Sequence, residues 1–216
     1  MTKRLRHSKI ELALHRLRDG DGRPLLLLHG LGERAPAGAA PALASWPGPV
    51  WALDFTGHGE STRPLGGGYT AECLMGDADA AIAELGTATL YGRGLGAWVA
   101  LLAAGARPQA VRGAVLADGP GLAGGGARPT SPLIPFVDAR APVPPDAFAL
   151  VELSRDIRPP EYATAFVRLA KHLSGLAHPL TVCAHERPEW LRAVVKEPGV
   201  ETASLPAALA AYAKVS

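Results

Sequence analysis

Cysteines, aromatic residues and long apolar runs are all scarce in this chain of 216 residues. The two cysteines, Cys73 and Cys183, lie far apart and lack the spacing of metal ligands, so the sequence predicts no metal site and a reducing, cytoplasmic location. No apolar run approaches the roughly 20 residues that cross a bilayer. No apolar segment follows the basic residues at the start either. We therefore expect neither a membrane span nor a secretory signal.

An excess of either charge is also missing. Lysine and arginine number 22 against 20 acidic residues, for a net charge of +2. This balance gives no electrostatic reason to expect a nucleic acid or a membrane as partner, and the basic residues Lys3, Arg4 and Arg6 fit a solvated terminus. Hydrophobic residues make up 48% of the chain and charged residues 19%, which suits one folded domain with a substantial core.

Short, continuous apolar runs recur along the chain, and most are followed by a glycine-rich turn and a helical pattern. Continuous apolar character is typical of strands that are covered on both faces, as in a parallel sheet. The β-then-α order therefore predicts an α/β fold with a mostly parallel, doubly wound sheet. An alternating segment at 9–18, followed by Asp-Gly-Asp-Gly, predicts an edge hairpin. The expected strands are 24–29, 50–55, 88–91, 111–118, 180–185 and a weaker last one, and the expected helices are 37–46, 70–85, 95–106, 188–195 and 205–214.

One long stretch, from Gly119 to about Pro179, breaks this rhythm because it contains no evident strand. It opens with glycine-rich and proline-rich segments and continues with helical patterns at 146–156 and 160–174. We expect a core formed by residues 1–120 and 179–216, with a small helical lid at 121–178 inserted before the penultimate strand. Such a lid would cover the carboxyl ends of the strands, where ligands bind in open α/β sheets.

Three short motifs follow three of the predicted strands. They are His-Gly-Leu-Gly at 29–32, Asp-Phe-Thr-Gly-His-Gly-Glu-Ser at 54–61 and Gly-Arg-Gly-Leu-Gly at 92–96. In this order they resemble the α/β-hydrolase superfamily, most closely its small lid-bearing esterases, lipases and carbon–carbon hydrolases, over nearly the whole chain. The resemblance implies an α/β-hydrolase fold and identifies 92–96 with the nucleophile elbow, the G-x-S-x-G turn between a strand and a helix.

The side chains that this superfamily uses for catalysis are missing from their usual places. Gly94 occupies the position of the nucleophilic serine, although glycine readily adopts the strained backbone of the turn. The base histidine of the family follows the last strand, but here no histidine occurs after His185. Glu186 could fill the position of the acid, and Asp118 stands where some relatives carry theirs. The resemblance therefore implies a degenerate triad that does not support serine-type hydrolysis.

The backbone groups of the pocket do not depend on those side chains. The resemblance places the N–H groups of Leu31 and Leu95 where they could hold a carbonyl oxygen or an anion. Arg93 could reach an anionic ligand. We therefore predict that the protein binds a small, largely apolar molecule with a carbonyl or anionic group, without a cofactor or metal. The predicted ligand-binding residues are His29, Gly30, Leu31, Arg93, Gly94 and Leu95.

Three other functions stay open. Asp118, His185 or Glu186 could act as the base of a cofactor-free hydrolysis, lyase or oxygenation step. Residues 92–97 also match the G-x-G-x-x-A turn of dinucleotide-binding oxidoreductases, although too few strands follow for the second half of that fold. The lid surface could also bind another protein, and the sequence does not determine the oligomeric state.

Overall fold

A mostly parallel sheet runs through the computed structural model, which describes residues 1–125 and 144–215. Its eight strands lie in the order β1-β2-β4-β3-β5-β6-β7-β8. The pairs β1–β2 and β2–β4 are antiparallel and the other pairs are parallel, which confirms the predicted α/β class. The strands are β1 Thr2–His7, β2 Ile10–Arg18, β3 Leu25–Leu28, β4 Val50–Asp54, β5 Ala88–Arg93, β6 Val111–Ala117, β7 Leu180–Val182 and β8 Val200–Thr202.

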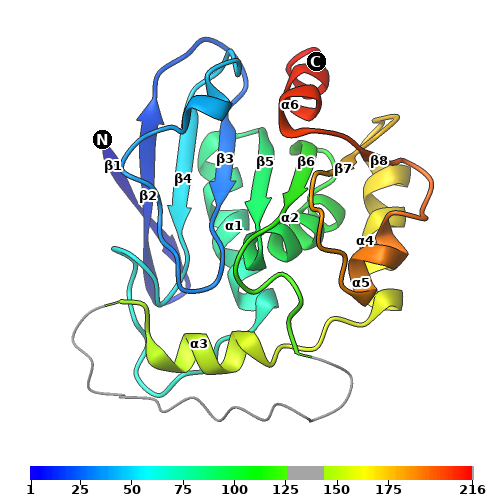
Figure 1. Cartoon of the computed structure of the whole chain (residues 1–216). Helices are drawn as coiled ribbons and strands as arrows, with labels where there is room; N and C mark the ends of the chain where they lie inside the picture. The colour runs from blue at the N-terminus through cyan, green and yellow to red at the C-terminus, as the bar shows by residue number, and fades with distance from the viewer. Residues whose placement is uncertain (126–143, 216) are drawn as a thin grey trace.

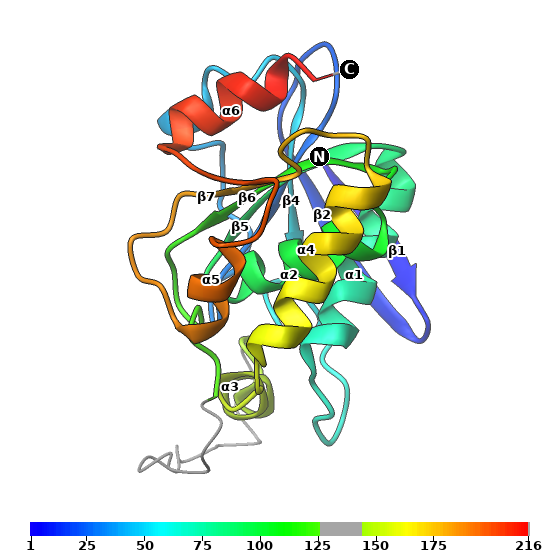
Figure 2. The same cartoon turned by 90° about the vertical axis from the view of Figure 1, so that its right-hand side faces the viewer.

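Helices cover the two faces of this sheet unequally (Figures 1 and 2). On one face α2 packs against the sheet, with α1 and α4 against α2 and α5 against α4. The other face, which we call the α6 face, carries α6 and a short 3₁₀ helix, η1. The helices are η1 Pro41–Leu43, α1 Ala71–Leu85, α2 Leu95–Ala106, α3 Ala147–Ser154, α4 Pro160–Leu173, α5 Glu189–Val194 and α6 Leu205–Ala213.

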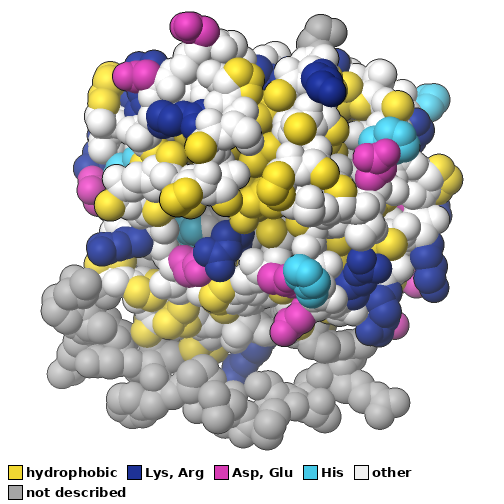
Figure 3. All heavy atoms as spheres, turned by 45° about the horizontal axis from the view of Figure 1, so that its top comes forward, with side chains coloured by type: hydrophobic (Ala, Val, Ile, Leu, Met, Phe, Trp, Pro, Cys, Tyr) yellow, Lys and Arg dark blue, Asp and Glu magenta, His cyan; other side chains and the backbone are white. Residues whose placement is uncertain are grey.

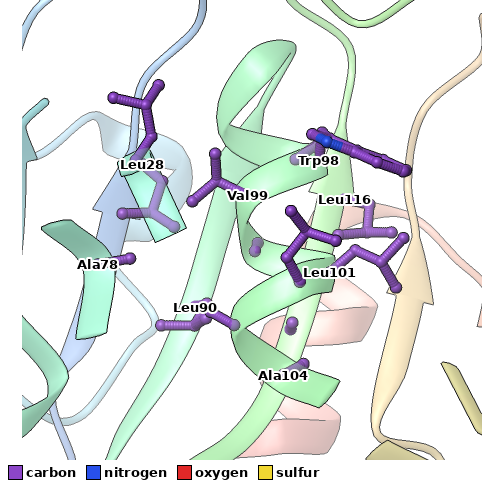
Figure 4. Packing of buried hydrophobic residues seen from close by; sticks show 14 of the residues in the cluster. Leu28, Ala78, Leu90, Trp98, Val99, Leu101, Ala104 and Leu116 are labelled. Carbon is purple, nitrogen blue, oxygen red and sulfur yellow. The ribbon is translucent and has the colours of Figure 1, made fainter. Parts of the chain in front are cut away.

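The core follows from the continuous apolar strands. Successive side chains of a strand point to opposite faces, so Leu26 and Leu28 of β3 enter the cluster under α2, whereas Leu25 and Leu27 enter the smaller cluster under α6. The α2 helix is buried from Leu95 to Gly105 because both the sheet and α4 cover it. Figure 4 shows side chains of this helix, among them Val99 and Leu101, together with Leu90 and Leu116 of the strands.

The helix expected at 37–46 is wrong. Only Pro41–Leu43 form a turn of 3₁₀ helix there. Pro41 lies in the middle of the expected helix, where it has no N–H to donate and its ring clashes with the preceding turn. Parallel strands are usually connected through a helix, so the irregular connection between β3 and β4 leaves the α6 face thinly covered.

The basic start of the chain forms an edge strand, β1, in which Arg4 and Arg6 are exposed to solvent. It forms the hairpin with β2 through a turn at Ser8, whose φ is 56°. The predicted hairpin therefore exists, but its turn is at Ser8 and Lys9 and not at the Asp-Gly-Asp-Gly segment that follows β2.

Both helices of the expected lid form, but they lie in different places. The α3 helix lies beyond the carboxyl end of the sheet (Figure 1), whereas α4 packs against α2 and α5 with Ala163, Val167 and Ala170 in the main core. Part of the predicted lid, 126–143, lies outside the described residues, and the division of the chain at 121–178 stays a prediction. In the two described ranges, no helix combines the length and apolar character that a membrane crossing requires.

Candidate functional site

The turn between β5 and α2 is sharp and depends on its three glycines. Gly94 has φ 56° and ψ −118°, a conformation that side chains other than glycine rarely adopt. A Cβ on Gly92 would lie 2.1 Å from the carbonyl oxygen of Gly96, and a Cβ on Gly96 would lie 2.1 Å from that of Leu28. The backbone of the predicted turn is therefore present at 92–96, without a side chain at its centre.

A carbonyl of the protein's own chain occupies the space in front of this turn. The Pro120 carbonyl oxygen accepts hydrogen bonds from the backbone N–H groups of Leu31 and Leu95, each at 2.9 Å. A Cβ on Gly94 would lie 2.0 Å from the same oxygen and 2.5 Å from the carbonyl carbon of Gly119. The two donors that were expected to hold a ligand are thus already bonded within the chain. Sequence reasoning missed this contact.

We call residues 119–122 the strap. Nη1 of Arg158 donates to the carbonyl oxygens of Gly121 and Leu122, both at 2.6 Å, and Nε1 of Trp190 donates to that of Leu122 at 2.9 Å. The Arg158 guanidinium lies over the Trp98 ring, 5.5 Å from its centroid. Burial lowers the pKa of Arg158 to about 10, although Asp156 opposes the shift, so the guanidinium stays positive at neutral pH.

The loop after β3 is held by two buried histidines. Nδ1 of His29 hydrogen-bonds to the carbonyl oxygen of Gly30 at 2.7 Å, and its Nε2 accepts from the backbone N–H of Phe55 at 3.1 Å. His58 accepts in the same way from the N–H of Gly32 at 3.3 Å. Burial, with His58 nearby, lowers the pKa of His29 to about 3, so its ring is neutral. Both ring nitrogens of His29 are used, and its role here is to shape the loop.

Asp118 and His185 come together where β6 and β7 end. Oδ2 of Asp118 lies 3.0 Å from Nδ1 of His185. The carboxylate also accepts from the backbone N–H groups of His185, at 2.8 Å, and Glu186, at 3.0 Å. Burial alone would raise the pKa of Asp118, but these hydrogen bonds hold it below its usual value. Of the three candidate bases, Asp118 and His185 thus pair through their side chains, whereas Glu186 takes part through its backbone.

This pairing could have been predicted, because β6 and β7 are neighbours and the carboxyl ends of parallel strands meet at one edge of the sheet. The His185 side chain is 95% exposed. Cys183 lies in the same region, and burial, with Asp118 nearby, raises the pKa of its thiol to about 11. That thiol is therefore protonated at neutral pH and is not a ready nucleophile.

Arg93 lies on the α6 side of the turn. Its Nη1 is 3.4 Å from Oε1 of Glu33, and its Nε donates to the carbonyl oxygen of Asp118 at 3.4 Å. Arg93 and His29 line a cavity of about 460 Å³, and a second hollow of about 670 Å³ is lined by Asp118 and His185. Both hollows reach the α6 face. In the part of the chain that the structure describes, no three histidine, cysteine, aspartate or glutamate side chains gather as metal ligands.

A sequence profile of the Alpha/beta hydrolase family matches residues 25–215. A Klebsiella pneumoniae structure, provisionally assigned as an epoxide hydrolase, superimposes with a TM-score of 0.64 at 19% identity, covering 99% of this chain and 97% of that one. A hypothetical protein of Pseudomonas aeruginosa gives 0.63 at 21% identity, with 99% and 97% covered. The N-formylmaleamic acid deformylase of Pseudomonas putida gives 0.58 at 18% identity, with 94% and 92% covered.

At these identities the structural likeness carries the fold alone, and a sequence search of curated proteins gives no match. The matched profile and the strand order also show that the dinucleotide-binding interpretation of residues 92–97 is wrong. In that interpretation the amino end of α2 would bind a phosphate group through its free N–H groups. Here the Leu95 N–H is bonded to Pro120 instead.

Proposed function

This chain belongs to the α/β-hydrolase family, and we propose that it is a member that binds a small, largely apolar molecule without serine-type hydrolysis. The observation that carries this proposal is the Pro120 carbonyl at the two N–H donors beside Gly94. Gly94 provides no nucleophile. The donors that would polarise a substrate carbonyl are already bonded to Pro120. Both halves of acyl transfer are disabled at the same place.

Because the Leu31 and Leu95 donors are occupied, we expect a lower residual rate of hydrolysis than the absence of a serine alone would leave. Enzymes that lose triad members keep about 10³–10⁴-fold acceleration over water, which comes from the oxyanion site and substrate binding. Here the strap fills that site, so even this residual rate is not expected. The ligand is accordingly held outside the Leu31–Leu95 pair unless Pro120 is displaced.

The first experiment measures hydrolysis of short aryl esters and lactones by wild type and by Gly94→Ser. We expect rates at the buffer background for both, because serine at 94 meets the strap and has no base histidine. Acceleration by wild type of about 10³-fold over water would refute the closed oxyanion site, and more than about 10⁴-fold would refute the proposal as a whole. A large gain in Gly94→Ser would show that a serine at this position hydrolyses esters without the base histidine of the family, and would refute the view that the turn cannot support hydrolysis.

The second experiment tests binding. Purified protein is denatured, and the released small molecules are identified by mass spectrometry beside a thermal-shift screen of apolar carbonyl compounds and carboxylates. We expect one chemical class both to co-purify and to raise the unfolding temperature. If neither approach yields a ligand, the binding half of the proposal is wrong.

One observation favours a second candidate, an enzyme that uses His185 as a base. The Asp118 carboxylate orients Nδ1 of His185, which leaves Nε2 as a possible proton acceptor. The test is turnover of the same panel by His185→Ala. The matched control is His178→Ala, which removes another exposed histidine that pairs with a carboxylate, Glu201, at 3.3 Å. Equal rates in wild type and both variants exclude His185 as the base.

A further inference from the structure

The cavity of about 460 Å³ exists because the connection between β3 and β4 does not cover the sheet. Its floor consists of side chains that β3, β4 and β5 direct to the α6 face, among them Leu27, Ala52 and Tyr91. Leu43 of η1 and Leu205 of α6 form its sides. A typical pocket for a small molecule measures about 300–1,000 Å³ and is mostly apolar. The size and lining of this cavity therefore suit the body of an apolar small molecule.

The border of the cavity carries charge of mainly one sign. Arg34 and Arg93 both line it, together with a single carboxylate, Glu33. Glu33 lies 3.4 Å from Arg93, while Arg34 is exposed and forms no ion pair with any residue in the described ranges. In Figure 3 hydrophobic side chains gather in the middle of the visible face, with basic, acidic and histidine side chains below them.

Within the lining of this cavity, two arginines stand against one carboxylate, which leaves one positive charge in excess. A ligand with a single negative charge balances it, whereas a doubly charged group would leave a net negative charge beside Glu33. A guanidinium also offers paired N–H donors that match the two oxygens of a carboxylate.

We propose that the α6-face cavity binds an apolar monocarboxylate, with its hydrocarbon part against Leu27, Ala52 and Leu205 and its carboxylate at Arg34 and Arg93. The inference rests on the proposed ligand-binding function and names the site and the class of ligand. The site shares His29 and Arg93 with the predicted ligand-binding residues, because both line this cavity. It does not use the N–H groups of Leu31 and Leu95, which are bonded to Pro120. The ligand lies on the α6 face, and the strap keeps its place.

The experiment is isothermal titration calorimetry with sodium decanoate, and with decanol and decyltrimethylammonium as uncharged and cationic comparisons. We expect one decanoate to bind per chain, about fivefold tighter than decanol, because partly exposed ion pairs contribute about 1 kcal/mol. Arg34→Gln should remove most of this preference without changing decanol binding. Equal binding of all three probes overturns the assignment of a carboxylate.

The position of the site is tested by filling the cavity. Ala42 is exposed and lines it, so Ala42→Trp should place a ring inside and weaken decanoate binding by about tenfold. Ala44 is also exposed and belongs to the same turn but does not line the cavity, so Ala44→Trp should bind like wild type. Circular dichroism and the unfolding midpoint of each variant show whether it folds.

Each outcome decides a separate claim. Decanoate binding that Ala42→Trp leaves unchanged places the ligand elsewhere and overturns this inference, while the proposed function stands. No decanoate binding by wild type overturns the inference as well. The proposed function is then judged by the hydrolysis assay and the co-purification experiment, neither of which depends on Ala42 or Arg34.

Discussion

Serine at position 94 tests directly whether the strap closes the turn. Its Cβ would be 2.0 Å from the Pro120 carbonyl oxygen, and the nearest atoms are all backbone, so the strap has to move. Moving it breaks the hydrogen bonds from Leu31 and Leu95, which contribute about 1 kcal/mol each. A side chain at positive φ costs about 1–2 kcal/mol in addition. We therefore expect Gly94→Ser to lower the free energy of unfolding by about 3–4 kcal/mol.

Gly86→Ser separates these two costs. Gly86 also combines a positive φ, 81°, with a negative ψ, −70°, but a Cβ there would meet nothing within 4 Å. This control should show the backbone cost alone. The difference between the variants is then about 2 kcal/mol, or a midpoint about 4–8 °C lower for Gly94→Ser. Urea unfolding followed by tryptophan fluorescence measures the difference in free energy, and thermal unfolding measures the shift of the midpoint. Equal destabilisation of the two variants would refute the closed turn.

Three further predictions concern the stability of the fold. Lowering the pH from 7 to 5 should destabilise the protein by about 2 kcal/mol through His29. The pKa of His29 is about 3 in the folded protein against an ordinary 6.5, so at pH 5 the ring is protonated in the unfolded chain but not in the folded one. Urea titrations at both pH values measure this loss of stability. Arg158→Met should lower the free energy of unfolding by about 2 kcal/mol and speed amide hydrogen exchange at Leu31 and Leu95, measured by NMR. Thr70→Ala should cost about 1 kcal/mol, read from urea unfolding, because its hydroxyl caps α1 by accepting from the N–H of Cys73 at 3.2 Å.

Each of these has a contradicting result. The stabilising effect of a neutral His29 is complete above pH 6.5 and fades as the pH falls, so equal stability at pH 7 and 5 would contradict the buried, neutral ring. For Arg158 the control is Arg155→Met, an exposed neighbour, and unchanged exchange rates in Arg158→Met would show that the strap does not need the guanidinium. For Thr70 the control is Ser204→Ala, since Ser204 precedes α6 without a side-chain cap.

Much of the fold could be predicted from local patterns. The strand at 25–28 and the helix at 95–106 lie where their apolar runs predict them, because burial on both sides demands continuous apolar residues. The turn at 92–96 could be predicted from its glycine pattern, although the backbone atoms that leave no room for a Cβ at Gly94 and Gly96 belong to the distant residues Pro120 and Leu28. The prediction of a helix at 37–46 is wrong because it follows the alanines of this segment, whereas Pro41 in its middle interrupts a helix.

The absence of a serine at position 94 and of any histidine after His185 can be seen in the sequence without a structure. The state of the pocket cannot be read in this way. Whether the N–H groups of Leu31 and Leu95 face a ligand or Pro120 depends on contacts between segments about 25 and 90 residues apart, and no local preference encodes them. The Asp118–His185 pair and the cavity on the α6 face arise in the same way, from strands and loops that meet only when the sheet has formed.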